Sequence, residues 1–503
     1  MDGIAFALGH RPNILCFVAD QMRSDSLHHL GNDASITPNL DRIPAEDGVS
    51  FKNAYCQNPV CVPSRCSFLS GLYPHTTGHR TMHYLQRDAS EPNMLRAMKD
   101  AGYEVIWIGR NDVIPGDRDK TPYCDEFHDG VHPGDTKSDP HPFAPGAGTK
   151  RAKPTPEQMA DNAYYSFYIG RLPDGEGYGK TDWNCVDAAI DYLDRRAAHP
   201  SDKPFFVYCT IAFPHPPYGC EDPWYSSIDR SKLPARRPDI KTLDHKASML
   251  YGINAKQHLD TWTEDRFDEL RATYLAMVSR FDYQYGMIEK KLRDTGLYED
   301  TSIFVWSDHG DYTCDYGIAE KVQNCFEDCV SNVPLIVKPA SGITVEPRIS
   351  SALVELTDIS ATVEQMAQTR FLWIGFGESL MPVLAGSESV RDCVICEGGR
   401  IHGETQAMES GHGPESPYWP RLSTQESEGP EHTKACMIRM GNLKYTMRLY
   451  EDDELYDLNS DPMECKNLID DPAYAVDLER LRMRLLCRYM ETGDYVPQGR
   501  DKR

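Results

Sequence analysis

Residues 58–71 read NPVCVPSRCSFLSG, and the rest of the chain is organised around this stretch. A Cys with Pro two residues later, Arg four residues later and a Gly behind an apolar pair predicts a loop that leads into a helix. The start of such a helix offers unpaired backbone N–H groups and a positive dipole end to an anion. Arg65 adds a planar cation suited to an oxyanion. We therefore predict that Cys61 is a reactive position in an anion-binding pocket; the alternative is a buried cysteine before a helix.

The composition limits the class of protein. A chain of 503 residues suggests two or three domains. Hydrophobic residues make up 40% and aromatic residues 10% of it, which indicates a globular fold. The net charge of -24 disfavours nucleic acid or an anionic membrane as the main partner. An acidic protein that acts on an anion needs clustered Arg and Lys, or a metal ion, at its site.

Residues 1–10 lack a basic n-region and a long apolar core, so no signal peptide is predicted, and no window approaches the length of a membrane span. The 16 cysteines are scattered and not framed as a small disulfide scaffold. We expect them to be mostly reduced and the protein to be cytoplasmic, or periplasmic or secreted if a leader was removed. Cys393 and Cys396 lie in an apolar run that favours a strand over a redox or zinc site.

Two predicted strands end in potential metal ligands. Residues 14–19 and 302–306 are continuous apolar runs, which suit strands buried on both faces of a largely parallel sheet. Asp20 and Gln21 follow the first run, and residues 308–309, Asp and His, follow the second. Functional groups gather at the carboxyl ends of strands in open α/β sheets, and these donors can complete one metal site. The alternative for Asp20 is a helix N-cap.

Two further predicted strands, residues 102–109 and 204–211, lead to Arg110 and His215. Arg110 can clamp an anion, and a His flanked by prolines favours a positioned acid or base. The alternative for His215 is a packing or turn residue. Helices are predicted over residues 182–196 and 270–292, irregular structure over 114–182, and a Gly, Glu and Ser rich insertion over 398–432.

Together these motifs resemble the type I sulfatases, whose signature is Cys-x-Pro-Ser-Arg followed by a Gly. The family also has Asp-Asp or Asp-Gln after its first strand, Pro-His-x-Pro after a middle strand and Asp-Asn or Asp-His after a later one. The resemblance implies an alkaline-phosphatase-like α/β fold, with a mostly parallel sheet sandwiched by helices and a smaller C-terminal antiparallel sheet. It implies a catalytic domain over residues 1–371 and a C-terminal subdomain over 372–503 that completes the cleft.

The resemblance also implies a chemistry. A formylglycine-generating enzyme would oxidise Cys61, and a hydroxyl of the aldehyde hydrate would attack sulfur. A divalent cation, most simply Ca²⁺ with Mn²⁺ or Mg²⁺ as alternatives, would be held by a set of family ligands, namely Asp20, Gln21, Cys61, Asp308 and His309. Arg65 and Arg110 would bind the anion, and His215 or Lys321 would protonate the departing alcohol. Taken alone, Lys321 could be a solvated surface charge.

Two positions depart from the family pattern. Ser70 stands where Thr is more usual. More importantly, Gly109-Arg110-Asn111-Asp112 stands where the family commonly has Gly-Lys-x-His. Arg110 can replace the Lys as a clamp, but Asp112 cannot do what a protonated His does beside an oxyanion. Asp112 is therefore a candidate catalytic residue, or a partner for a substrate hydroxyl or amine.

Three rival functions are considered. Relatives with the same ligand pairs cleave phosphonate monoesters or phosphodiesters, and an extra positive charge near the site would favour the dianion of phosphorus. A binding protein that had lost catalysis would lack the nucleophile or a metal carboxylate, and neither is missing. A hydrolase that uses the unmodified thiol lacks a convincing neighbouring base. We favour a sulfated carbohydrate over an aryl or alkyl sulfate because the excursions are polar and aromatic, with Trp183, Trp224, Tyr218 and Trp419.

Overall fold

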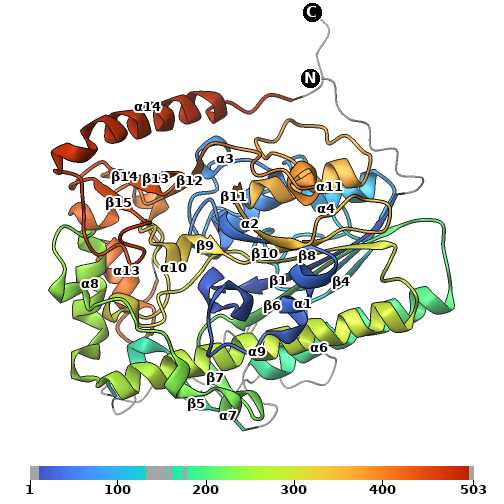
Figure 1. The fold of residues 1–503 in the computed structure, drawn as a ribbon, viewed down its shortest axis with the longest axis horizontal. Helices are drawn as coiled ribbons and strands as arrows, with labels where there is room; N and C mark the ends of the chain where they lie inside the picture. Colours follow the sequence, from blue (N-terminus) through green and yellow to red (C-terminus); the bar gives the residue numbers. More distant parts are fainter. Residues whose placement is uncertain (1–10, 132–155, 157–160, 174–177, 410, 498–503) are drawn as a thin grey trace, which may run out of the picture.

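A nine-stranded sheet lies at the centre of the computed structural model, which describes residues 11–131, 156, 161–173, 178–409 and 411–497 (Figure 1). The strand order is β11-β2-β10-β8-β1-β6-β3-β4, and β9 pairs with β2. The strand bounds are β1 Asn13–Asp20, β2 Val49–Tyr55, β3 Glu104–Gly109, β4 Glu126–His128, β6 Phe205–Pro214, β8 Thr301–Ser307, β9 Asn332–Val333, β10 Leu335–Lys338 and β11 Arg348–Glu355.

Most neighbours in this sheet are parallel. β1 lies between β8 and β6 and is parallel to both, and β3 continues the parallel arrangement beyond β6. β10 is antiparallel to both β8 and β2. The predicted mostly parallel α/β sheet is confirmed, and the apolar runs that predicted its strands lie in its middle.

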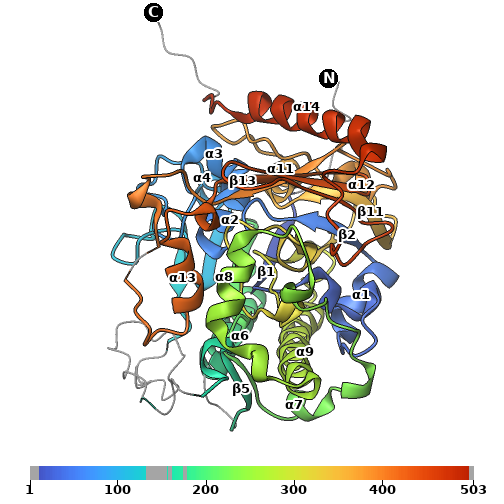
Figure 2. The ribbon, with the colours of Figure 1, turned by 90° about the vertical axis from the view of Figure 1, so that its left-hand side faces the viewer.

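Helices cover both faces of the sheet (Figures 1 and 2). Alternate residues of β1 enter two different cores: Leu15, Phe17 and Ala19 face one, and Ile14, Cys16 and Val18 face the other. The first core contains side chains of α1 (Pro38–Glu46), α6 (Tyr178–Ala198) and α9 (Glu264–Asp294). The second contains side chains of α2 (Cys61–Ser70), α4 (Met94–Asp100), α11 (Thr357–Met366) and α12 (Met381–Leu384).

The longest helix, α9, also positions α1. A carboxylate oxygen of Asp282 accepts the Leu40 backbone N–H at 2.8 Å, and the other oxygen accepts the Asn39 side-chain amide at 2.8 Å. These bonds satisfy backbone donors in the first turn of α1. Gly286 makes the approach feasible, because a Cβ there would lie 2.6 Å from Asn39 Cγ.

A separate four-stranded antiparallel sheet lies near the C-terminus, as predicted. Its strands are β12 Val394–Gly398, β13 Ala435–Met440, β14 Leu443–Arg448 and β15 Glu454–Asp457, and α14 (Ala475–Thr492) packs on it. The β12–β13 connection holds α13 (Trp419–Gln425), beside α8 (Ser248–Gln257) (Figure 2). Cys393 and Cys396 are buried free thiols at this sheet, which agrees with the strand interpretation. The division at residues 371 and 372 stays a prediction.

Short elements connect these units. They are α3 Pro74–Thr77, β5 Tyr168–Arg171, β7 Tyr218–Cys220, α7 Trp224–Ser227 and α10 Asp328–Ser331, with several 3-10 turns between them. The predicted irregular segment 114–182 falls partly outside the described residues, and its described parts contain β4, β5 and the start of α6.

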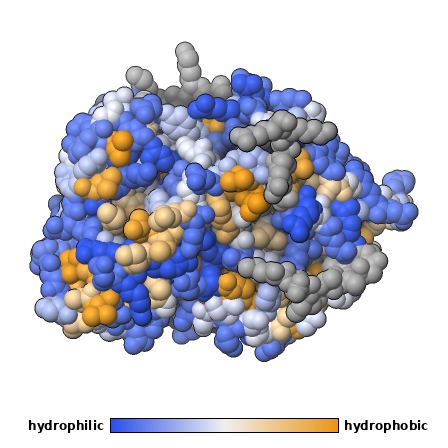
Figure 3. Space-filling model, turned by 90° about the horizontal axis from the view of Figure 1, so that it is seen from above, coloured by the Kyte–Doolittle hydropathy of each residue, from blue (hydrophilic) through white to orange (hydrophobic). Residues whose placement is uncertain are grey.

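The surface carries apolar side chains in separate groups on a largely hydrophilic face (Figure 3). On α14, Val476, Met483, Leu486 and Met490 are exposed. No helix among the described residues is both long enough and apolar enough to cross a lipid bilayer.

Candidate active site

The candidate site lies where four neighbouring strands end. β3, β6, β1 and β8 are adjacent in the sheet and parallel, so their carboxyl ends share one edge. Arg110 follows β3, His215 follows β6, Asp20 ends β1, and residues 308–309 follow β8. The topology therefore brings together groups that are up to about 290 residues apart in the sequence.

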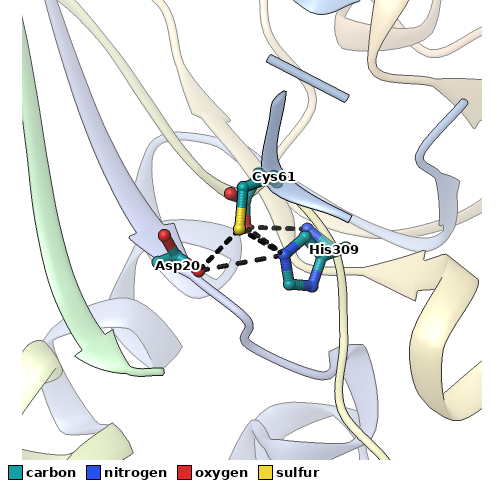
Figure 4. Close-up of side chains that lie close together, drawn as sticks. Asp20, Cys61 and His309 are labelled. Carbon is teal, nitrogen blue, oxygen red and sulfur yellow. Dashed lines mark hydrogen bonds and ion pairs between the residues drawn. The ribbon is translucent and has the colours of Figure 1, made fainter. Parts of the chain in front are cut away.

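Cys61 joins this group from the other side of the cleft. It is the first residue of α2, after the extended Val60, and is 2% exposed. Its Sγ lies 3.2 Å from His309 Nε2 and 3.7 Å from Asp20 Oδ1 (Figure 4). Ligand atoms of Asp20, Cys61, Asp308 and His309 all lie within 4.8 Å of one another, so four of the five predicted metal ligands, the nucleophile among them, form one buried cluster.

Two arginines bind the outer oxygens of the carboxylates. Arg65 donates to Asp308 Oδ2 at 2.9 Å and to Asp20 Oδ2 at 3.0 Å, and Arg110 donates to the same Asp20 oxygen at 2.8 Å. Burial alone would raise the pKa of Asp20, but Arg110, His215, Arg65 and Lys321 hold it well below its usual range. Asp20 is therefore an anion in the fold, and its Oδ1 faces Cys61.

Gln21 holds the cluster together through an unusual backbone conformation. Its φ is 71°, and its backbone N–H donates to Asp308 Oδ1 at 3.0 Å. Its side-chain oxygen accepts from Lys321 Nζ at 2.7 Å, and its amide nitrogen donates to Asp311 Oδ2 at 2.5 Å. A non-glycine residue with positive φ at a strand end is a feature of functional sites.

Each of the two histidines is oriented by a backbone carbonyl. His309 Nδ1 donates to the Gly310 carbonyl at 2.9 Å, and His215 Nδ1 donates to the Pro216 carbonyl at 2.5 Å. Burial lowers the pKa of both rings, and Lys321 lowers it further in each. With Nδ1 protonated, the neutral His309 ring directs its Nε2 lone pair at the cluster.

Asp112 lies beside the site, as its position after β3 predicts. Its φ is 29°, its Oδ2 is buried without a hydrogen-bond partner, and Arg110 Nε lies 3.5 Å from that oxygen. Gly109 permits the turn: its φ is 89°, and a Cβ there would lie 1.7 Å from the Thr210 carbonyl oxygen. Burial is the main cause of the raised pKa of Cys61, and Asp112 adds a smaller increase. The pKa of Arg65 is raised against the effect of burial, chiefly by Asp308 and Asp20, and again Asp112 adds a smaller increase.

Within the 398–432 insertion, sequence reasoning did not single out Arg421. Arg421 of α13 pairs with Glu409 at 2.9 Å and with Glu320 at 3.2 Å. Burial lowers the pKa of Arg421, but these two carboxylates raise it above its usual value, with a smaller contribution from Cys61. Arg421 is thus within electrostatic reach of the nucleophile. No motif marked it, because the insertion has neither strand periodicity nor a family signature.

The aromatic residues offered for sugar binding make packing and hydrogen-bond contacts within the protein. Tyr218 is fully buried and donates to Asp311, and Trp183 stacks with Trp224 and Tyr283 rather than against the cluster. The alternative interpretation, that these three residues serve in packing, accounts for the contacts they make, and their part in sugar binding stays a prediction. Trp419 lies in α13, where it contacts Tyr165.

Comparisons with known proteins agree with this geometry. The family model described as Sulfatase matches residues 12–369. A multifunctional alkaline phosphatase superfamily protein, PehA of Trinickia caryophylli, is 27% identical, covering 92% of each chain. The phosphonate monoester hydrolase of Agrobacterium radiobacter superposes with a TM-score of 0.70 at 21% identity, covering 97% of this chain and 100% of that one. A protein solved with its substrate D-glucosamine-2-N,6-O-disulfate superposes with a TM-score of 0.70 at 18% sequence identity, and the match covers 98% of this chain and 100% of that one.

The sequence and fold similarities define a class of hydrolases that includes an alkaline phosphatase superfamily protein and a phosphonate monoester hydrolase. Within that class the chain belongs to the sulfatase family, and its activity is that of a sulfuric ester hydrolase.

Proposed function

We propose that this sulfatase removes sulfate from a sulfated carbohydrate, using a formylglycine made from Cys61 and a divalent cation. The observation that carries the proposal is the contact of Cys61 with Asp20 and His309, since a helix start and two strand ends converge on one buried point. A substrate sugar is supported by the likeness of the fold to a protein solved with a sulfated glucosamine.

The residues present fit a hard divalent cation. The arginines occupy Oδ2 of Asp20 and of Asp308, so Oδ1 of Asp20 is turned to the cluster, where His309 Nε2 lies 3.8 Å away. Carboxylate and amide oxygens with one imidazole suit Ca²⁺, and also Mn²⁺ or Mg²⁺. When bound, such an ion supplies Lewis-acid polarisation of an ester oxygen. Asp20, Gln21, Asp308 and His309 would hold it, with the modified Cys61 as a further ligand.

The chain's own residues then supply positioning and proton transfer. The hydrated aldehyde provides one hydroxyl to attack sulfur and a second whose proton loss expels sulfate. Arg65 and Arg110 are the cations beside the developing charge. Burial lowers the pKa of Lys321, but the neighbouring Glu320 and Asp20 raise it above its usual value, so Lys321 keeps its proton. Lys321 is therefore the favoured donor to the leaving oxygen, whereas the neutral His215 already commits its N–H to Pro216.

For the rival function, a hydrolase that uses the unmodified Cys61 thiol, the structure provides a neighbouring base, but the electrostatics of the site disfavour it. The structure does place His309 Nε2 3.2 Å from Cys61 Sγ, which the sequence did not predict. However, burial and then Asp20 raise the pKa of the Cys61 thiol, and burial lowers the pKa of His309. Both directions disfavour the thiolate–imidazolium pair that a thiol nucleophile needs.

A phosphorus ester is the second candidate, supported by the likeness to a phosphonate monoester hydrolase. The extra cation that would favour a dianion is Arg421. Its charge is balanced by Glu320 and Glu409, so it adds no net positive charge. That balance disfavours a dianion such as a phosphate monoester, whereas sulfate esters, phosphodiesters and phosphonate monoesters are all monoanions.

A panel assay separates these candidates. Protein produced with a formylglycine-generating enzyme should release sulfate from at least one sulfated sugar with a higher kcat/KM than for phosphonate monoesters or phosphodiesters. Cys61→Ala should abolish that release, whereas Cys465→Ala, at a partly exposed cysteine, should retain it. Turnover of phosphorus esters alone would replace the sulfate proposal with the second candidate.

A further inference from the structure

A second group of potential metal ligands lies outside the active site. It consists of His402, Glu428 and His432, whose ligand atoms lie within 4.8 Å of one another. His402 comes shortly after β12, and the other two precede β13, so the group joins the two ends of the connection that carries α13. Backbone contact already ties these ends, since the Arg400 N–H donates to the His432 carbonyl at 3.0 Å.

The environment of His432 indicates that this group binds a ligand. Its side chain is fully buried, and neither ring nitrogen makes a hydrogen bond of normal geometry, although the Ser427 backbone lies near the ring. Its neighbours are the rings of His402 and Tyr450, with centroids 4.9 Å and 5.9 Å away. Buried polar atoms are almost always paired, so an imidazole with two unsatisfied nitrogens indicates a missing partner.

The other two residues already have suitable spacing. His402 Nδ1 lies 3.4 Å from Glu428 Oε2. Tetrahedral ligands at about 2.0–2.1 Å from zinc lie about 3.3 Å apart, so this pair fits one edge of such a site. Arg400 Nη1 binds the other Glu428 oxygen at 2.9 Å and orients the carboxylate. The His402 and Glu428 side chains are 47% and 52% exposed, which gives an ion a path from solvent.

We propose that His402, Glu428 and His432 bind a zinc-class divalent transition ion, with water as the fourth ligand. Two imidazoles and one carboxylate are ligands that such ions prefer, whereas calcium prefers sites in which most ligands are oxygen atoms. The ion links the two ends of the 398–432 insertion. Through α13 this insertion places Arg421 against Glu320, the residue before Lys321. The second metal thus stabilises the wall of the active site without touching substrate.

Calorimetric titration with zinc chloride tests this proposal. Chelator-stripped protein is first given excess calcium, which suits the oxygen-rich active site and not a histidine pair. His402→Ala and Glu428→Gln change exposed ligands and spare the buried ring. His199→Ala, at an exposed histidine in another part of the chain, is the matched control.

Wild type and His199→Ala should bind one equivalent of zinc at least tenfold more tightly than His402→Ala and Glu428→Gln. Zinc should also raise the Tm of the first pair and leave that of the second pair unchanged. The proposal is overturned if all four proteins bind zinc alike, or if the wild type binds none under these conditions.

Discussion

At the residue scale, the catalytic cluster was largely readable from the sequence. Asp20, Arg110, His215 and residues 308–309 each follow a continuous apolar run, and the ends of parallel strands must meet at one edge. Arg421 was not readable, because its position depends on how a long irregular connection folds back over the sheet. The pairing of Gln21 with Lys321 and Asp311 also depends on a positive φ that no local pattern predicts.

Asp112 gives the sharpest test at this scale. We expect Asp112→Asn to lower kcat/KM by about 10²-fold or more, as for loss of an acid–base group, because its buried Oδ2 has no hydrogen-bond partner and lies 3.5 Å from Arg110, which binds Asp20 of the cluster. Steady-state kinetics with a sulfated substrate measure it. Asp117→Asn, at an exposed carboxylate, is the control. Equal kcat/KM for Asp112→Asn and wild type would remove Asp112 from the mechanism.

At the element scale, the strands were predicted from continuous apolar runs and the long helices from their periodicity. α6 and α9 extend beyond their predicted bounds. The antiparallel insertion of β10 between β8 and β2 was not predicted, since a short apolar run does not reveal strand direction. α13 was not predicted either, because seven residues in a polar insertion give too short a pattern.

The joint between α9 and α1 predicts a pH dependence of stability. Burial raises the pKa of Asp282 to about 7, against its hydrogen bonds to Leu40 and Asn39. A carboxyl whose pKa is higher in the fold contributes stability below its unfolded pKa, and this contribution is lost as pH rises to about 7. Relative to Asp282→Asn, wild type should lose on the order of 2–3 kcal/mol of unfolding free energy between pH 5 and pH 8.

Denaturant unfolding of both proteins at several pH values measures this difference. The opposite result would be that the unfolding free energy of wild type rises relative to that of Asp282→Asn as the pH increases. It would show that the backbone N–H groups of α1 keep the carboxylate ionised despite its burial.

At the scale of the whole molecule, a chain of net charge -24 gathers two buried carboxylates at one point and balances them with arginines. A divalent cation should therefore couple to global stability. We expect chelation to lower the Tm and calcium to restore it, with about 2.7 kcal/mol of stabilisation at one hundred times the Kd. Scanning calorimetry measures the shift.

Two variants make that result specific. Asp308→Asn should lose the calcium-dependent part of the Tm, whereas His402→Ala should keep it, because His402 lies in the second ligand group. A calcium response that survives in Asp308→Asn would place the cation elsewhere. The cytoplasmic location stays a prediction from the N-terminal sequence.

The central claim is that Cys61 acts as formylglycine and not as a thiol. Mass spectrometry of the tryptic peptide that contains Cys61, from protein co-produced with a formylglycine-generating enzyme, tests it most directly when sulfate release is measured on the same sample. The account predicts an aldehyde in place of the thiol, with sulfate release proportional to the converted fraction. Full activity in protein whose Cys61 is entirely unmodified would contradict it.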